Sequence, residues 1–173
     1  AAQPGPEVAF TWQGGEPTLM GLDFYKRTVE LQKKYGVSGQ EVANSLQTNA
    51  LLLDNPAWGR FLHENKFLVG VSIDGPKELH DHYRLDLGGH GTWDRVMRAI
   101  DCCREHQVEF NTLTLVNHLT AERPDEVFDF LIGLGVRYLQ FIPCVEVDPQ
   151  TGRIAAFSVT PRQYADFQCR VFD

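Results

Sequence analysis

The sequence predicts an α/β fold made of repeated strand–helix units. Short apolar stretches of strand length alternate five times with longer stretches of helical periodicity. Capping and turn-forming residues separate these stretches. Such alternation implies parallel strands joined by right-handed crossovers. Two architectures satisfy the pattern, an open doubly wound sheet and a barrel or part of one.

The five expected strands lie at about residues 8–13, 42–48, 67–73, 109–116 and 138–142. The third, FLVGVSI, is apolar enough to be buried on both faces.

The first expected helix begins near Leu22 and stops at Gly36. Its inward face is predicted to carry Phe24, Thr28, Leu31 and Tyr35. The later helices are expected to start at recognisable capping residues, which are Asn55-Pro56, Thr92, Pro124 and Thr160-Pro161.

Composition excludes several functional classes. The 173 residues carry a formal charge of −7, which argues against a nucleic acid or an anionic membrane as the main partner. No apolar run approaches the roughly 20 residues of a membrane helix. The four cysteines, Cys102, Cys103, Cys144 and Cys169, have neither CxxC nor CxxxC spacing. We therefore expect free thiols in a reducing compartment, the cytoplasm.

Polar residues cluster where the predicted strands end. Because the carboxyl ends of parallel strands share one edge, we expect a ligand site there. The residues expected to line its cavity are Gln13, Thr48, Asn49, Asp74, Asn111 and Gln140.

The stretch QGGEP, directly after the first strand, suits an ammonium-bearing ligand. Gly14 and Gly15 let backbone N–H groups approach a ligand, and Glu16 supplies an anion beside them. A simple tight turn with a solvated glutamate is the alternative.

Five stretches together resemble one enzyme family. They are WQGGEPTL, QTNALLLD, VGVSIDGPKELHDHYR, EFNTLTLVN and YLQFIPCVE. Their order and spacing are similar to those of radical SAM enzymes, and in particular of the anaerobic sulfatase-maturating enzymes with a SPASM-type C-terminal region. The resemblance implies that residues 1–173 form a single core of a partial (β/α)6 TIM-like barrel that lacks the first unit.

The resemblance also implies cofactor contacts. Gly14, Gly15 and Glu16 would hold the amino group of S-adenosyl-L-methionine, and Ser72 would touch the cofactor. Arg84 would bind the methionine carboxylate, for which a guanidinium fork is suited. Val145 would pack near the adenine.

The implied activity is that of a radical SAM oxidoreductase. A 5′-deoxyadenosyl radical would take hydrogen from Cβ of a cysteine or serine in a sulfatase polypeptide, and formylglycine would result. A related SPASM peptide-modifying enzyme and a non-catalytic TIM-like binding domain are the alternatives.

The chain departs from the family in two respects. The CxxxCxxC motif that holds the [4Fe–4S] cluster is absent, and so is the SPASM region. We expect no metal site here and no activity of these residues alone. The unpaired edge of the first strand could support a dimer.

The remaining polar candidates have structural explanations. In ELHDHYR, His80 and His82 are expected to be solvated residues of a loop.

Overall fold

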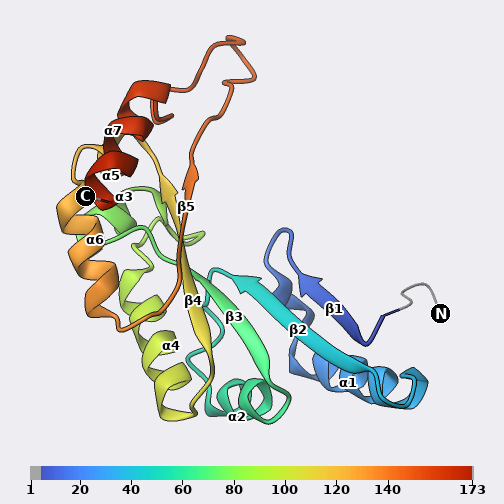
Figure 1. The fold of residues 1–173 in the computed structure, drawn as a ribbon. Helices are drawn as coiled ribbons and strands as arrows, with labels where there is room; N and C mark the ends of the chain where they lie inside the picture. The colour runs from blue at the N-terminus through green and yellow to red at the C-terminus, as the bar shows by residue number, and fades with distance from the viewer. Residues whose placement is uncertain (1–4, 173) are drawn as a thin grey trace. The chain divides into compact units, whose positions relative to one another are not determined.

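The computed structural model describes residues 5–172. The chain divides into two compact units, residues 1–71 with 95–110, and residues 72–94 with 111–173. The strands follow one another in the sheet in the order β1-β2-β3-β4-β5. Figure 1 shows the elements by label.

The first unit contains parallel strands and the helices that follow them. Strand β1 pairs with β2, and β2 pairs with β3, both in parallel. Its elements are β1 (Glu7–Trp12), the 3-10 helix η1 (Pro17–Met20), α1 (Leu22–Tyr35), β2 (Glu41–Thr48), α2 (Pro56–Glu64), most of β3 (Phe67–Ser72) and most of α4 (Trp93–Glu105).

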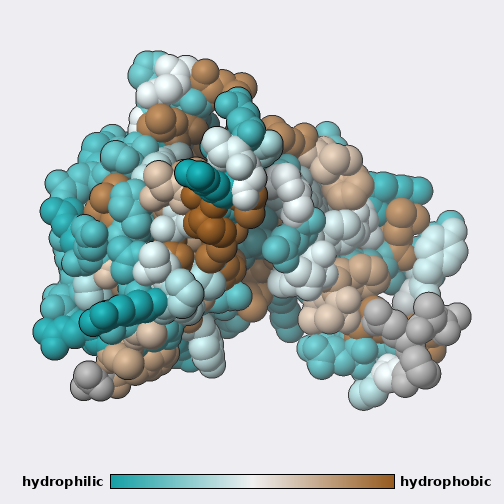
Figure 2. Space-filling view, turned by 90° about the horizontal axis from the view of Figure 1, so that it is seen from above, coloured by the Kyte–Doolittle hydropathy of each residue, from teal (hydrophilic) through white to brown (hydrophobic). Residues whose placement is uncertain are grey.

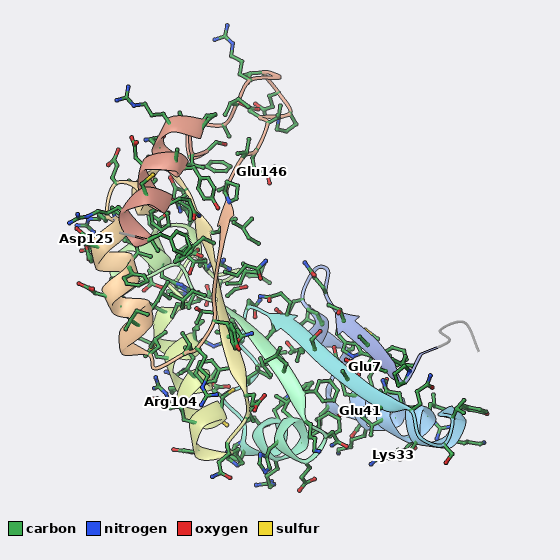
Figure 3. The ribbon with its side chains drawn as sticks, viewed as in Figure 1. Glu7, Lys33, Glu41, Arg104, Asp125 and Glu146 are labelled. Atoms are coloured by element: carbon green, nitrogen blue, oxygen red, sulfur yellow. The ribbon has the colours of Figure 1, made fainter. Side chains whose placement is uncertain are left out.

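The second unit contains the other parallel pair, β4 with β5. Its elements are α3 (Lys77–Tyr83), β4 (Phe110–Val116), α5 (His118–Ala121), α6 (Pro124–Gly133), β5 (Leu139–Pro143) and α7 (Pro161–Phe172). Helices α6 and α7 lie side by side in Figure 1. A two-bond ion pair of 2.8 and 3.0 Å joins Arg170 of α7 to Asp125, which Figure 3 labels at the start of α6.

All ten main elements are confirmed, with strand ends shifted by at most one residue and helices that begin where the capping residues predicted. One prediction is wrong, because ELHDHYR is the helix α3 and not a loop. This helix has seven residues, and its buried side chains are the adjacent pair Leu79 and His80. Two neighbouring buried positions, of which only Leu79 is apolar, give no helical period, so the pattern alone could not identify the helix.

The inward face predicted for the first helix is also wrong. Tyr25 and Val29 are the buried residues of α1, whereas Leu31 is 37% and Tyr35 71% exposed. Tyr25 packs edge-on against Trp12 and Trp58, at ring distances of 5.6 and 5.4 Å. The chosen row is rotated from the buried one by a single residue, about 100° on a helix.

Three residues of the wrongly chosen row, Thr28, Leu31 and Tyr35, line an open apolar groove beside β1. The groove has a volume of about 600 Å³. It is lined mainly by Val8, Phe10, Trp12, Leu31, Tyr35 and Val37. Figure 2 shows hydrophobic residues, in brown, among hydrophilic ones on the face in view. The predicted edge-mediated dimer stays a prediction.

Candidate functional site

The QGGEP turn follows β1 and has the backbone conformation that glycine permits. Gly14 has φ 108° and Gly15 has φ 52°. A Cβ added at either position would meet no atom within 4 Å. Backbone conformation, and not crowding, therefore selects these glycines, and both residues are exposed.

The Glu16 carboxylate accepts most of its hydrogen bonds from residues of its own compact unit. Oε1 accepts hydrogen bonds from Thr18 N at 2.9 Å, Thr18 Oγ1 at 2.6 Å and Thr48 Oγ1 at 2.7 Å. Oε2 accepts one from Asn49 N at 2.7 Å. Glu16 thus ties the turn to the end of β2, and Oε2 alone keeps capacity for a further donor.

Thr48 serves this turn and does not line a cavity. Its side chain faces the buried side of β2, where the residue is 2% exposed. Its neighbour Gln47 lies on the other face, above Gly70 of β3. A Cβ on Gly70 would stand 2.0 Å from Gln47 Oε1, so glycine leaves the room that this side chain needs.

In the second unit, Asp74 and Arg84 form a two-bond ion pair. Arg84 Nε donates to Asp74 Oδ2 at 2.5 Å, and Nη2 donates to Oδ1 at 3.0 Å. Oδ1 also accepts from Leu115 N at 2.8 Å. Asp74 is 2% exposed, and its carboxylate is bonded to Arg84 and to the backbone of β4.

The Arg84 guanidinium has one edge that its ion pair with Asp74 does not use. Both bonds to Asp74 use Nε and Nη2, and Nη1 has no hydrogen-bond partner among residues 5–172. The side chain is 24% exposed. A planar guanidinium can bind a second carboxylate through such an edge.

The other predicted site residues are all accessible. Gln13, Gln140 and Val145 are exposed, and Asn49, Ser72 and Asn111 are half-buried. Gln140 stands opposite Leu113 in the register, two residues after Asn111, so Asn111 and Gln140 share one face of the sheet.

His80 is the residue that the sequence analysis placed wrongly. It is fully buried and hydrogen-bonded through both ring nitrogens, to Asp74 N and to Thr92 Oγ1. Burial lowers the pKa of His80 to about 4. The spacing of four residues between His80 and Arg84, one helical turn, was the available signal.

The cysteines do not fit an iron–sulfur cluster. Over the described range, no group of three His, Cys, Asp or Glu side chains could hold a metal ion. Burial raises the pKa of Cys102 and Cys144, and that of Cys103 to about 12. Three of the four thiols are buried, and the four cysteines lack the CxxxCxxC spacing that holds such a cluster.

Comparison with known proteins defines the class to which this fold and these residues belong. The model of the Radical SAM superfamily matches residues 1–131. The chain therefore belongs to the radical SAM superfamily.

Among its relatives are anaerobic sulfatase-maturating enzymes. The chain is 42% identical, over 99% of its length, to the serine-type enzyme of Bacteroides thetaiotaomicron. It is 40% identical, over 95% of its length, to the cysteine-type enzyme of Clostridium novyi. It spans 44% of the length of each of these relatives.

Solved structures confirm the predicted fold class, a partial TIM-like barrel. A structure described as native anSMEcpe with bound AdoMet and Cp18Cys peptide matches with a TM-score of 0.93 at 39% identity, over 99% of this chain and 48% of that chain. SuiB of Streptococcus suis, bound to its precursor peptide SuiA, matches with a TM-score of 0.55 at 18% identity, which shows a shared fold alone. Within residues 5–172, no helix is long and apolar enough to cross a membrane.

Proposed function

We propose that this chain is the S-adenosylmethionine-binding core of an anaerobic sulfatase-maturating enzyme. The complete enzyme would oxidise a cysteine or serine of a sulfatase to formylglycine. The observation that carries the proposal is the TM-score of 0.93, at 39% identity, with a protein described as having AdoMet and a peptide bound.

The residues of this chain would bind and orient the cofactor. Oε2 of Glu16 and the backbone beside Gly14 and Gly15 offer acceptors for the ammonium group. The Nη1 edge of Arg84 offers donors for the carboxylate. The exposed side chain of Val145 suits the adenine face. When cleaved, the cofactor supplies the 5′-deoxyadenosyl group that takes hydrogen from the substrate.

The cofactor requirement extends beyond these residues. Because the cysteines here do not fit a [4Fe–4S] cluster, we expect other parts of the polypeptide to hold it. Such a cluster and free thiols both favour a reducing compartment, so we place the protein in the cytoplasm.

The substrate is expected to be a peptide segment with either target residue. Identity to the serine-type and cysteine-type relatives is nearly equal, at 42% and 40%. The proposal therefore covers both a serine and a cysteine target.

The test uses the full polypeptide that the reading frame encodes, reconstituted anaerobically and reduced. Sulfatase peptides with cysteine, serine or alanine at the target position would be incubated with S-adenosylmethionine. We expect 5′-deoxyadenosine, and formylglycine by mass spectrometry from the cysteine or serine peptide but not from the alanine peptide.

Two arginine variants supply the control. Arg84→Ala should abolish product, whereas Arg162→Ala should not, because the Arg162 side chain is 92% exposed. 5′-Deoxyadenosine without formylglycine would point to a different peptide modification. Absence of both products, with the cluster present, would contradict the proposal.

A further inference from the structure

A buried chain of hydrogen bonds joins the backbones of the two residues that form the ion pair. Asp74 N–H donates to His80 Nδ1 at 3.3 Å. His80 Nε2 lies 3.0 Å from Thr92 Oγ1, and Thr92 Oγ1 donates to the carbonyl of Arg84 at 2.8 Å. We call these three bonds the histidine relay. His80 is 0% and Thr92 4% exposed, so water does not supply substitutes.

The two ends of the histidine relay fix the direction of every bond in it. A backbone N–H can only donate, so His80 Nδ1 must be the acceptor and the ring proton lies on Nε2. The carbonyl of Arg84 can only accept, so the Thr92 hydroxyl proton points to it and its oxygen accepts from Nε2. The ring is therefore neutral, in agreement with the pKa of His80, which burial lowers to about 4.

Further contacts hold the Arg84 end of the relay. Arg84 N–H donates to the His80 carbonyl at 3.0 Å, and Thr92 N–H donates to the Arg84 carbonyl at 3.2 Å. Asp81 Oδ1 accepts from Trp93 N at 2.8 Å, which anchors the segment after Thr92. A Cβ on Gly91 would lie 2.2 Å from the Asp81 carboxyl carbon, so glycine is needed there.

The relay determines where the Arg84 side chain can reach. With both backbones fixed, Nε and Nη2 meet the Asp74 carboxylate, and the Nη1 edge is turned away from it. We propose that His80 and Thr92 are positioning residues, which hold the Asp74–Arg84 pair so that the outer guanidinium edge is ready for the carboxylate of S-adenosylmethionine. The inference rests on the proposed function, because that function places this carboxylate at Arg84.

A pair of Thr92 variants tests the relay with little change in shape. Thr92→Val removes the hydroxyl and keeps the branched side chain, and Thr92→Ser keeps the hydroxyl. The dissociation constant would be measured in the full reconstituted polypeptide for two ligands. They are S-adenosylmethionine and its decarboxylated form, which lacks only the carboxylate.

The expected loss is specific to the carboxylate. Thr92→Val should raise the dissociation constant of S-adenosylmethionine about fivefold to tenfold, which is the effect of roughly one hydrogen bond. It should change the dissociation constant of the decarboxylated ligand by less than about twofold. Thr92→Ser should bind both ligands as the wild type does. His80→Gln, a second variant at the other relay residue, should show the same selective loss.

A purely structural role would give a different result. Equal weakening of both ligands in Thr92→Val, or no weakening of either, would overturn the inference. Failure of the proposed function is recognised separately, in the wild type, as equal affinity for S-adenosylmethionine and its decarboxylated form. That result would overturn the inference as well, because no carboxylate would then be bound.

Discussion

Two carboxylates that the sequence suggested as ligand-facing groups are hydrogen-bonded mainly within the protein. Glu16 accepts four hydrogen bonds and Asp74 accepts three. A carboxylate that already accepts several hydrogen bonds fixes the orientation of the groups that donate them before a ligand binds. At the scale of single residues, both acids therefore act chiefly by fixing the donors around them.

Glu16→Gln tests this role. The amide nitrogen of glutamine cannot accept a hydrogen bond. The donors that bond to one of the two carboxylate oxygens of Glu16 therefore lose their acceptor. We expect the free energy of unfolding to fall by about 2 kcal/mol. Urea denaturation would measure it, with Glu41→Gln as the control, because Glu41 is exposed (Figure 3). An equal loss of unfolding free energy in Glu16→Gln and Glu41→Gln would contradict the prediction.

The neutral state of His80 predicts a stability that depends on pH. The pKa is about 4 in the folded protein, against 6.5 for an ordinary histidine. Burial is the main cause; nearby Asp74 and Asp81 oppose the shift, and Arg84 and Lys77 add to it. Between these pH values the unfolded chain binds more protons, so stability falls as pH falls from about 6.5 to about 4.

The change is measurable by urea denaturation. Between pH 7 and pH 5 the wild type should lose about 2 kcal/mol through this group. His80→Asn lacks the titrating ring but keeps an acceptor, so its loss over the same range should be smaller. An identical pH dependence in the two proteins would show that His80 is not the cause.

At the scale of elements, α1 shows how a helix with apolar residues on more than one face can mislead. Val29 is 8% exposed and Leu31 37%. The polar contact that marks the buried side is the pair Gln32 and Asn44, which exchange hydrogen bonds of 2.9 and 3.0 Å. The side-chain amide of Gln32, on the inward face of α1, thus finds its hydrogen-bond partner in Asn44 of β2.

Two substitutions in α1 distinguish the observed face from the predicted one. Val29→Ala should lower the free energy of unfolding by about 2 kcal/mol, because it removes buried methyl groups. Leu31→Ala removes more carbon from a partly exposed site and should cost less than about 1 kcal/mol. If thermal or chemical unfolding reversed this order, the assignment of the buried face would be wrong.

The sequence predicted the elements better than it predicted the contacts between them. Strand positions follow from apolar runs and capping residues, which are local signals. The relay from His80 to Thr92 joins residues twelve apart, and no local period reports it. Thr92 precedes α4 as predicted, but its hydroxyl bonds Arg84 and His80.

The candidate site shows the same division. Gly14 and Gly15 were predictable because positive φ selects glycine. The pairing of Arg84 with Asp74 was not, since it depends on how the segment after β3 returns to the strand end. The motif therefore predicted the candidate residues, and the fold determines what each one contacts.

At the scale of the whole molecule, binding and radical generation require different groups. The 173 residues include the groups for which we propose a role in cofactor binding, namely Arg84, the Gly14-Gly15 turn and Glu16. They include four cysteines without the CxxxCxxC spacing of a cluster. Cys102 and Cys103 are adjacent on α4, and both are buried.

We therefore expect these 173 residues alone, incubated anaerobically with iron, sulfide and reductant, to yield no 5′-deoxyadenosine from S-adenosylmethionine. Absorption spectroscopy would check for a cluster, and chromatography would measure the product. The full polypeptide, treated identically, is the control. Product from the 173 residues alone would show that cysteines outside the CxxxCxxC pattern can support the cluster. That result would contradict the view that cofactor binding and radical generation need different groups.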